Sequence, residues 1–159
     1  MSKTIETGTV ADAIEKTLIL KAPLDAVWRA LTDHEAFGTW FRVAIDRPFE
    51  PGERSTGRLR IPGYEHVKWT ATIREIRPQV LFSYTWHPYA VEADVDYSAE
   101  NPTLVEFRLE PVKEGTRLTV RESGFDLIPA HRRPDAFRMN SLGWGAQMEN
   151  VRVYVEGRE

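Results

Sequence analysis

A glutamate on an otherwise apolar strand face is the residue whose type and position point most directly to chemistry. The segment 116–125, TRLTVRESGF, alternates with period two and places Glu122 on the same face as Leu118 and Val120. A carboxylate removed from water needs a hydrogen-bonding partner, a raised pKa or a ligand. Two roles stay open for Glu122. It is either a structural group held by an inward Arg, Tyr or Trp, or a group that orients a ligand or acts as a general acid or base.

Large aromatic side chains accompany this glutamate on other inward positions. The chain has five Trp, five Tyr and seven Phe, enough large rings to wall a cavity as well as to fill a core. The alternative is that these rings form a plain aromatic core. If a reaction is catalysed, we expect the acid and base groups among Glu122, Tyr84 and His87. The expected ligand-binding set is Trp69, Tyr84, Trp86, Phe107, Glu122, Trp144 and Met148.

Other kinds of chemistry find no support in the sequence. The four histidines, including His87, show no metal-binding spacing, and there is no nucleophile elbow or phosphate-binding glycine loop. The absence of cysteine excludes disulfides and thiol catalysis. A formal net charge of -3 gives no basic field for nucleic acid. We therefore expect no metal, no cofactor, no nucleic-acid partner and, without a long apolar run, no membrane partner; the expected location is the cytoplasm.

Strands that carry these side chains are predicted through the middle of the chain. In 66–77 and 80–87, alternation turns Trp69 inward on the first strand and Val80, Phe82, Tyr84 and Trp86 inward on the second. The segment 88–102 has no clean period and is predicted to be a long loop. A hairpin follows, with strands 103–112 and 116–125 and a two-residue turn at Glu114–Gly115. This register predicts the pairs Leu109–Val120, Phe107–Glu122 and Val105–Gly124.

Helices are predicted at both ends of this strand-rich region. After a lead-in at 1–10 and a first strand at 13–21, PLDAVWRALTD and HEAFGTWF read as two short helices, the second capped by Asp33. The segment 134–155 is predicted to be one long helix. Gly143 and Gly145 weaken this helix relative to alanine. Two explanations stay open: close packing or a kink at this point, or a helix that can flex over a pocket. Its apolar stripe, which must pack against the sheet, is Phe137, Trp144, Met148, Val151 and Val155.

Several stretches taken together resemble a known family. They are APLDAVWRALTD followed by Trp40, then TLVEFRLEP, ESGF and GWGAQMENVRVYV, in this order and spacing from about residue 13 to residue 155. The chain resembles the START-like helix-grip (polyketide cyclase, SRPBCC) superfamily, and within it the branch of the activator of heat-shock protein 90 ATPase. This resemblance implies an α+β fold in which a curved antiparallel sheet of six to seven strands grips the C-terminal helix. It also implies a cavity between them that often holds an apolar molecule.

These observations lead to one expected function and two alternatives. We expect a single domain, residues 1–159, that binds or carries a small, largely apolar molecule, aromatic or acyl, between sheet and helix. One alternative is an enzyme of the cyclase, dehydratase or aromatase type that uses Glu122. The other is a protein-interaction module like the co-chaperone, although no chaperone-contacting residue can be matched and a chaperone partner is not expected. A homodimer is compatible with the sequence.

Overall fold

The computed structural model describes residues 12–92 and 94–157, which form seven strands, three α-helices and one short 3-10 helix. The predicted lead-in at 1–10 lies outside the described residues. In chain order the elements are β1 (Ala13–Leu20), α1 (Leu24–Thr32), α2 (His34–Phe41), β2 (Val43–Ile45), β3 (Arg54–Leu59), β4 (Lys68–Arg77), β5 (Leu81–Trp86), β6 (Thr103–Val112), β7 (Gly115–Ser123), η1 (Phe125–Leu127) and α3 (Arg133–Glu156).

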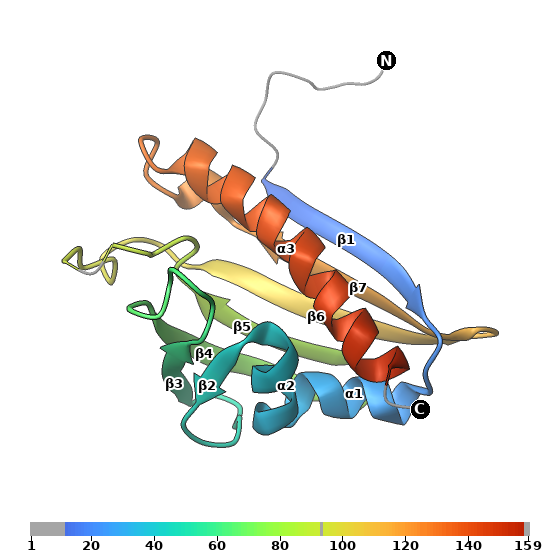
Figure 1. Ribbon diagram of the computed structural model, residues 1–159. Helices are drawn as coiled ribbons and strands as arrows, with labels where there is room; N and C mark the ends of the chain where they lie inside the picture. The colour runs from blue at the N-terminus through green and yellow to red at the C-terminus, as the bar shows by residue number, and fades with distance from the viewer. Residues whose placement is uncertain (1–11, 93, 158–159) are drawn as a thin grey trace, which may run out of the picture.

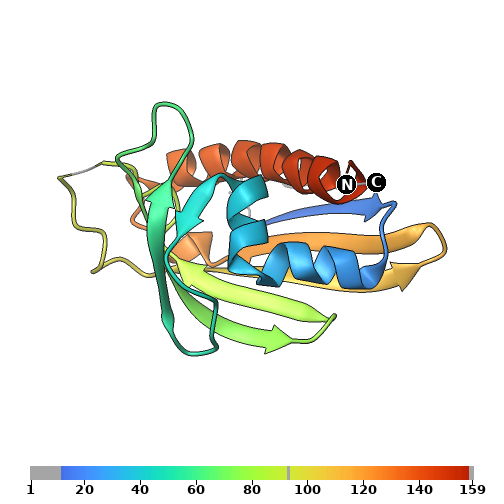
Figure 2. The ribbon, with the colours of Figure 1, turned by 60° about the horizontal axis from the view of Figure 1, so that its bottom comes forward.

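All seven strands form one antiparallel sheet in the order β1-β7-β6-β5-β4-β3-β2. Figure 1 shows α3 crossing one face of this sheet, with α1 and α2 beside the C-terminal part of α3. Figure 2, a view along the layers, shows how the sheet bends around the helices. The predicted fold class, an α+β helix-grip with two short helices after the first strand, is confirmed.

The two short helices form where the sequence predicts them. The Asp33 side chain accepts a hydrogen bond from the backbone N–H of Glu35 at 3.1 Å and so caps α2 as expected. Gly38, inside α2, is required by close packing, because a Cβ atom there would lie 2.3 Å from the carbonyl oxygen of Val43. Gly38 weakens the helix, but it allows the start of β2 to pack directly against α2.

The β4–β5 pairing also follows the prediction, with one exception. Ile73 pairs with Tyr84 as expected, and a bulge between Ile73 and Glu75 then shifts the register. The prediction that Val80 points inward is wrong: this side chain is 49% exposed. The reason is that Val80 belongs to the turn, where its N–H bonds the Arg77 carbonyl at 2.9 Å, and β5 begins one residue later.

The predicted register of the β6–β7 hairpin is wrong by two residues. The turn is Lys113–Glu114 rather than Glu114–Gly115, because Val112 pairs with Gly115. Gly115 is needed for packing at the start of β7: it has a φ of +147°, and a Cβ there would lie 2.2 Å from the carbonyl oxygen of Leu20. The observed pairs are Leu109–Leu118, Phe107–Val120 and Val105–Glu122. A shift of two residues keeps every side chain on its predicted face, so Glu122 still points inward.

The long connection predicted between β5 and β6 is present. Its described residues contain no helix or strand between Trp86 and Thr103. Within the described residues, no helix has the length and apolar character needed to cross a lipid bilayer.

Candidate ligand-binding site around Glu122

The carboxylate of Glu122 is buried completely and accepts hydrogen bonds from four uncharged side chains. Its Oε2 accepts from Trp86 Nε1 at 2.7 Å and from Thr103 Oγ1 at 2.5 Å. Its Oε1 accepts from Trp144 Nε1 at 2.8 Å, and Asn140 Nδ2 donates to both oxygens, at 2.9 and 3.2 Å. We call these five residues the Glu122 cluster. Four donors around two acceptor oxygens match the ionised form of the carboxyl group.

Each member of the Glu122 cluster is positioned by regular secondary structure. Trp86 and Thr103 are a cross-strand pair, the last residue of β5 and the first of β6. Glu122 lies one strand further, paired with Val105. Asn140 and Trp144 are four residues apart on α3 and therefore share the helix face that meets the sheet. The rigid sheet and the long helix thus converge on one carboxylate.

Aromatic side chains fill the space next to this cluster. Trp86 lies 5.4 Å from Tyr84 and 5.8 Å from Trp144, measured between ring centroids, and Phe107 lies 5.7 Å from Trp144. All rings of this group except Trp86 are buried, and Trp86 is partly exposed. We call the group the ring cluster: Phe37, Phe41, Trp69, Tyr84, Trp86, Phe107 and Trp144.

The hydroxyl group of Tyr84 stands out in the ring cluster. Among the described residues it is the buried side-chain polar atom that has no hydrogen-bond partner. The burial of Tyr84, together with the nearby negative charge of Glu122, raises its pKa well above the usual value of a tyrosine. This phenol therefore remains protonated at neutral pH, as a hydrogen-bond donor without an acceptor.

The structure brings the seven predicted ligand-binding residues together in one part of the core. Six of them belong to the Glu122 cluster or the ring cluster, and Met148 lies in the same core at 4% exposure. Their rings lie against one another in this structure. Two surface hollows, of about 340 and 330 Å3, lie elsewhere, beside the β1–α1 turn and beside the β2–β3 loop, and none of the predicted residues lines them.

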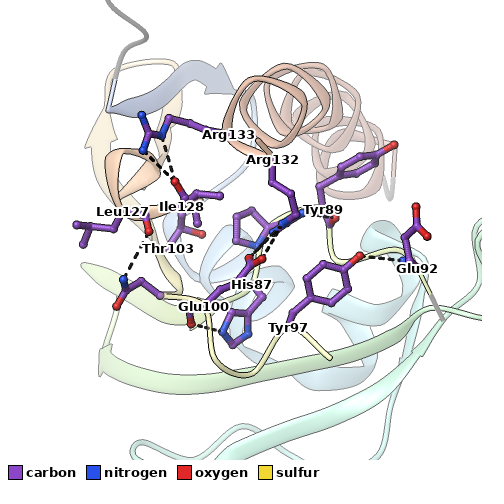
Figure 3. Close-up of polar contacts among 12 residues, drawn as sticks. His87, Tyr89, Glu92, Tyr97, Glu100, Thr103, Leu127, Ile128, Arg132 and Arg133 are labelled. Carbon is purple, nitrogen blue, oxygen red and sulfur yellow. Dashed lines mark hydrogen bonds and ion pairs between the residues drawn. The ribbon is translucent and has the colours of Figure 1, made fainter. Parts of the chain in front are cut away.

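The loop between Trp86 and Thr103 is fastened to the start of α3 by Arg132, as Figure 3 shows. Arg132 and Glu100 form a two-pronged ion pair with a closest distance of 2.8 Å, and both side chains are more than four-fifths buried. The same guanidinium donates to the backbone carbonyls of Pro88 and Tyr89, both at 3.0 Å. It also lies over the ring of Tyr97, 4.7 Å from its centre. We call this set of contacts the Arg132 latch.

His87 belongs to this loop and not to the Glu122 cluster. Its Nε2 and the carbonyl oxygen of Glu100 are 2.9 Å apart and hydrogen-bonded. No hydrogen bond joins any two of the three candidate catalytic groups, Glu122, Tyr84 and His87, within the described part of the chain. In that part, no three His, Cys, Asp or Glu side chains converge on a position that could hold a metal ion.

Sequence analysis missed several residues of the site. Asn140 could have been found, since it precedes Trp144 by one helical turn on the stripe that faces the sheet. Phe37 and Phe41 are also one turn apart on α2 and were predicted only as part of a short helix. Thr103 could also have been found, since the period of two in β6 places it on the same face as Val105 and Phe107. Arg132 carries no such signal, because its contacts join segments distant in the sequence.

A curved antiparallel sheet closed around a C-terminal helix, with a polar cluster inside the grip, defines a START-like helix-grip domain. Residues 21–156 match the family described as Activator of Hsp90 ATPase homolog 1-like protein. The chain belongs to this family, as its resemblance predicted.

Solved structures show the same fold at low sequence identity. The crystal structure of protein MLL2253 from Mesorhizobium loti has a TM-score of 0.74 and 20% identity, covering 92% of this chain and 98% of that one. DynU16, a putative protein in the dynemicin biosynthetic locus, has a TM-score of 0.70 and 19% identity, covering 92% of this chain and 48% of that one. The Aha1 dimer from Colwellia psychrerythraea has a TM-score of 0.68 and 17% identity, covering 92% and 98%. No functionally curated protein matches the sequence.

Proposed function

We propose that this protein is a cytoplasmic carrier that binds a small, largely apolar molecule, aromatic or acyl, between the sheet and α3. The observation that carries the proposal is the buried Tyr84 hydroxyl, which has no partner among the described residues. Leaving such a group unpaired costs about 1–3 kcal/mol. A polar atom of a bound molecule would remove this cost. Membership in a helix-grip family supports the same role.

The Trp86 side chain marks the place where such a molecule would bind. Its ring is the partly exposed one of the ring cluster, it lies 5.4 Å from Tyr84, and it directly precedes the loop that the Arg132 latch holds. Rotation of this one side chain would open an indole-sized space beside the Tyr84 ring. Glu122 Oε2 would keep Thr103 and Asn140 as donors, so the carboxylate would stay hydrogen-bonded.

The contacts of the candidate catalytic groups favour binding over catalysis. The raised pKa of Tyr84 makes its hydroxyl a weak acid at neutral pH. The oxygens of Glu122 are occupied by four donors, and the His87 ring is bound to a backbone carbonyl. An acid–base reaction that combined Tyr84 with Glu122 or His87 would need the second group to leave its present hydrogen-bond partners.

Two measurements test the proposed function. Native mass spectrometry of protein purified from its own source should detect a co-purifying small molecule. Fluorine NMR of protein labelled with fluorotryptophan should then locate it: addition of the molecule should shift the resonances of Trp86 and Trp144. Trp28, on α1 and outside the ring cluster, is the internal control and should shift least.

The outcomes separate the functions that the sequence left open. Shifts confined to Trp86, Trp144 and their ring neighbours would support the carrier. Conversion of the added molecule into a product, followed in the same sample, would favour the enzyme. A protein that carries no molecule and shows no shift with a panel of aromatic and acyl compounds is not a carrier of such ligands, and a protein-interaction module would then be the better hypothesis.

A further inference from the structure

The charge and the free donor inside the grip select among possible ligands, provided that the proposed function holds. The free donor is the Tyr84 hydroxyl, which is fully buried and unpartnered among the described residues. A phenol that keeps its proton can donate one hydrogen bond. The group that best satisfies it is therefore an acceptor on the ligand, such as a carbonyl oxygen.

The charge is that of Glu122, and no cation in the Glu122 cluster balances it. The four groups that bind the carboxylate are an amide, a hydroxyl and two indole N–H groups, which are all neutral. The arginines at the start of α3 have other partners: Arg132, just before the helix, is paired with Glu100, and Arg133 donates to backbone carbonyls. Arg138, further along the helix, is paired with Asp135. The raised pKa of Tyr84, caused partly by Glu122, indicates that the negative charge is felt at the phenol.

A second negative charge in the space that rotation of Trp86 would open would be repelled by Glu122 and stripped of its water. The Trp86 ring sets the size of the guest, since its indole group occupies the position beside Tyr84. The neighbours of that position are ring faces and edges, which favour an aromatic body.

We propose that the ligand of this grip is an uncharged aromatic molecule whose carbonyl oxygen accepts a hydrogen bond from Tyr84, and that Glu122 excludes aromatic carboxylates of the same size. The two residues then have separate roles. Tyr84 recognises the acceptor, and the Glu122 carboxylate discriminates against negative charge.

Three probes of nearly equal size test this inference by titration calorimetry near pH 8. They are methyl naphthyl ketone, naphthoate, and ethylnaphthalene, which has neither the acceptor nor the charge. We expect the ketone to bind about fivefold more tightly than ethylnaphthalene, the effect of one neutral hydrogen bond. We expect naphthoate to bind to the protein at least about tenfold more weakly than the ketone, because the anion loses its hydration beside Glu122.

Two variants assign the effects to their residues. Tyr84→Phe should remove the advantage of the ketone over ethylnaphthalene, because only the hydroxyl oxygen is lost. Glu122→Gln should narrow the gap between the ketone and naphthoate. If Glu122→Gln does not fold, Tyr84→Phe alone still tests the hydrogen bond, since a phenyl ring replaces the phenol in the same packing.

The possible failures can be told apart. If none of the three probes binds, the proposed function itself fails for ligands of this size. If they bind but naphthoate binds as tightly as the ketone, the carrier function stands and the exclusion of anions by Glu122 is wrong. If the preference for the ketone survives in Tyr84→Phe, the hydroxyl is not the group that recognises it.

Discussion

Glu122 shows how a single carboxylate can hold an otherwise apolar interior together. Its two oxygens are shared among donors from β5, β6 and α3, so one side chain links three elements that are far apart in the sequence. A hydrogen bond to a charged group contributes about 1.5–3 kcal/mol, more than a neutral one. The structural role that the sequence left open for Glu122 is thus evident in its contacts, and a ligand-selecting role is compatible with it.

Glu122→Gln should lower the free energy of unfolding by about 1–3 kcal/mol, because the amide nitrogen cannot accept from the donors that face it. Urea denaturation followed by tryptophan fluorescence measures this change. Glu110→Gln is the matched control, since Glu110 is a surface residue of β6 in an exposed ion pair with Arg117. This variant should unfold at nearly the wild-type urea concentration. Equal midpoints for Glu122→Gln and Glu110→Gln would contradict the structural role.

Tyr84→Phe should behave in the opposite way when no ligand is added. Removing an unpartnered buried hydroxyl relieves its desolvation, so the free energy of unfolding should stay the same or rise by up to about 1 kcal/mol. The same urea titration measures it. A clear loss of stability would mean that the hydroxyl is satisfied in solution, and the argument for a ligand acceptor would lose its basis.

At the scale of the element, α3 contains two glycines that no neighbouring element requires. A Cβ atom at Gly143 or Gly145 would meet no atom within 4 Å beyond the neighbouring residues and the helix backbone itself, so close packing does not explain them. They flank Trp144, which binds both the ring cluster and Glu122. The interpretations that remain from the sequence are a kink in the helix and a helix that can flex at this point.

The double variant Gly143→Ala and Gly145→Ala should therefore stabilise the protein, by about 0.8–1 kcal/mol for each glycine. Thermal unfolding measures the gain, and ligand association rates should fall if flexing of α3 admits the ligand. Gly38→Ala is the matched control within a helix. Its Cβ would lie 2.3 Å from a carbonyl oxygen, so it should destabilise; a loss in the α3 variant as well would show that these glycines have a packing role.

The Arg132 latch holds the loop of residues 87–102 against the start of α3, and a substitution can test this role. Arg132→Met removes the Arg132 latch, leaves Glu100 without its cation, and should raise the rate of cleavage within the loop by about tenfold or more. A glutamate-specific protease suits the acidic loop, and mass spectrometry locates the cuts. Arg138→Met, which removes an exposed ion pair to Asp135 on the same helix, should leave the cleavage rate unchanged. Similar rates in both variants would show that the latch does not hold the loop.

For the molecule as a whole, the parts of the fold that could be predicted from the sequence are those in which apolar residues recur with the period of a strand or a helix. The period of two in β7 placed Glu122 inside, and this survived a register error of two residues because such a shift preserves the face. The turn itself was misplaced because Gly115 was assigned to the turn, whereas its real constraint is the approach of the end of β1. A contact between distant segments cannot be recognised in local sequence.

The same limit applies to the site. Trp86, Glu122 and Trp144 were found because strand and helix periods turn them inward. The sequence pattern carries no information on how elements are placed relative to one another to within a few tenths of an ångström. That placement decides the mutual hydrogen bonds of these residues, the unpaired Tyr84 hydroxyl and the Arg132 latch.

The stability of the whole fold should also depend on Tyr84 in alkaline solution. The pKa of this tyrosine in the folded state is raised above its value of about 10 in the unfolded chain. Its contribution to the free energy of unfolding is therefore complete below pH 10. Above that pH the unfolded chain loses this proton first, and stability falls by up to about 1.4 kcal/mol per pH unit from this one group. Urea midpoints between pH 9 and 11 should therefore fall less steeply in Tyr84→Phe than in the wild type. Parallel curves would contradict the burial of an un-ionised phenol.

The two residues that border the long loop, Trp86 and Thr103, both donate to the same oxygen atom of Glu122. The ends of the loop are therefore fixed by the sheet and the carboxylate, independently of what lies between them. Since each doubling of a loop's length costs only about 0.6 kcal/mol in chain entropy, insertions here should be tolerated by the fold. Changes in the length of this connection could therefore alter the surface above Trp86 while the interior remains unchanged.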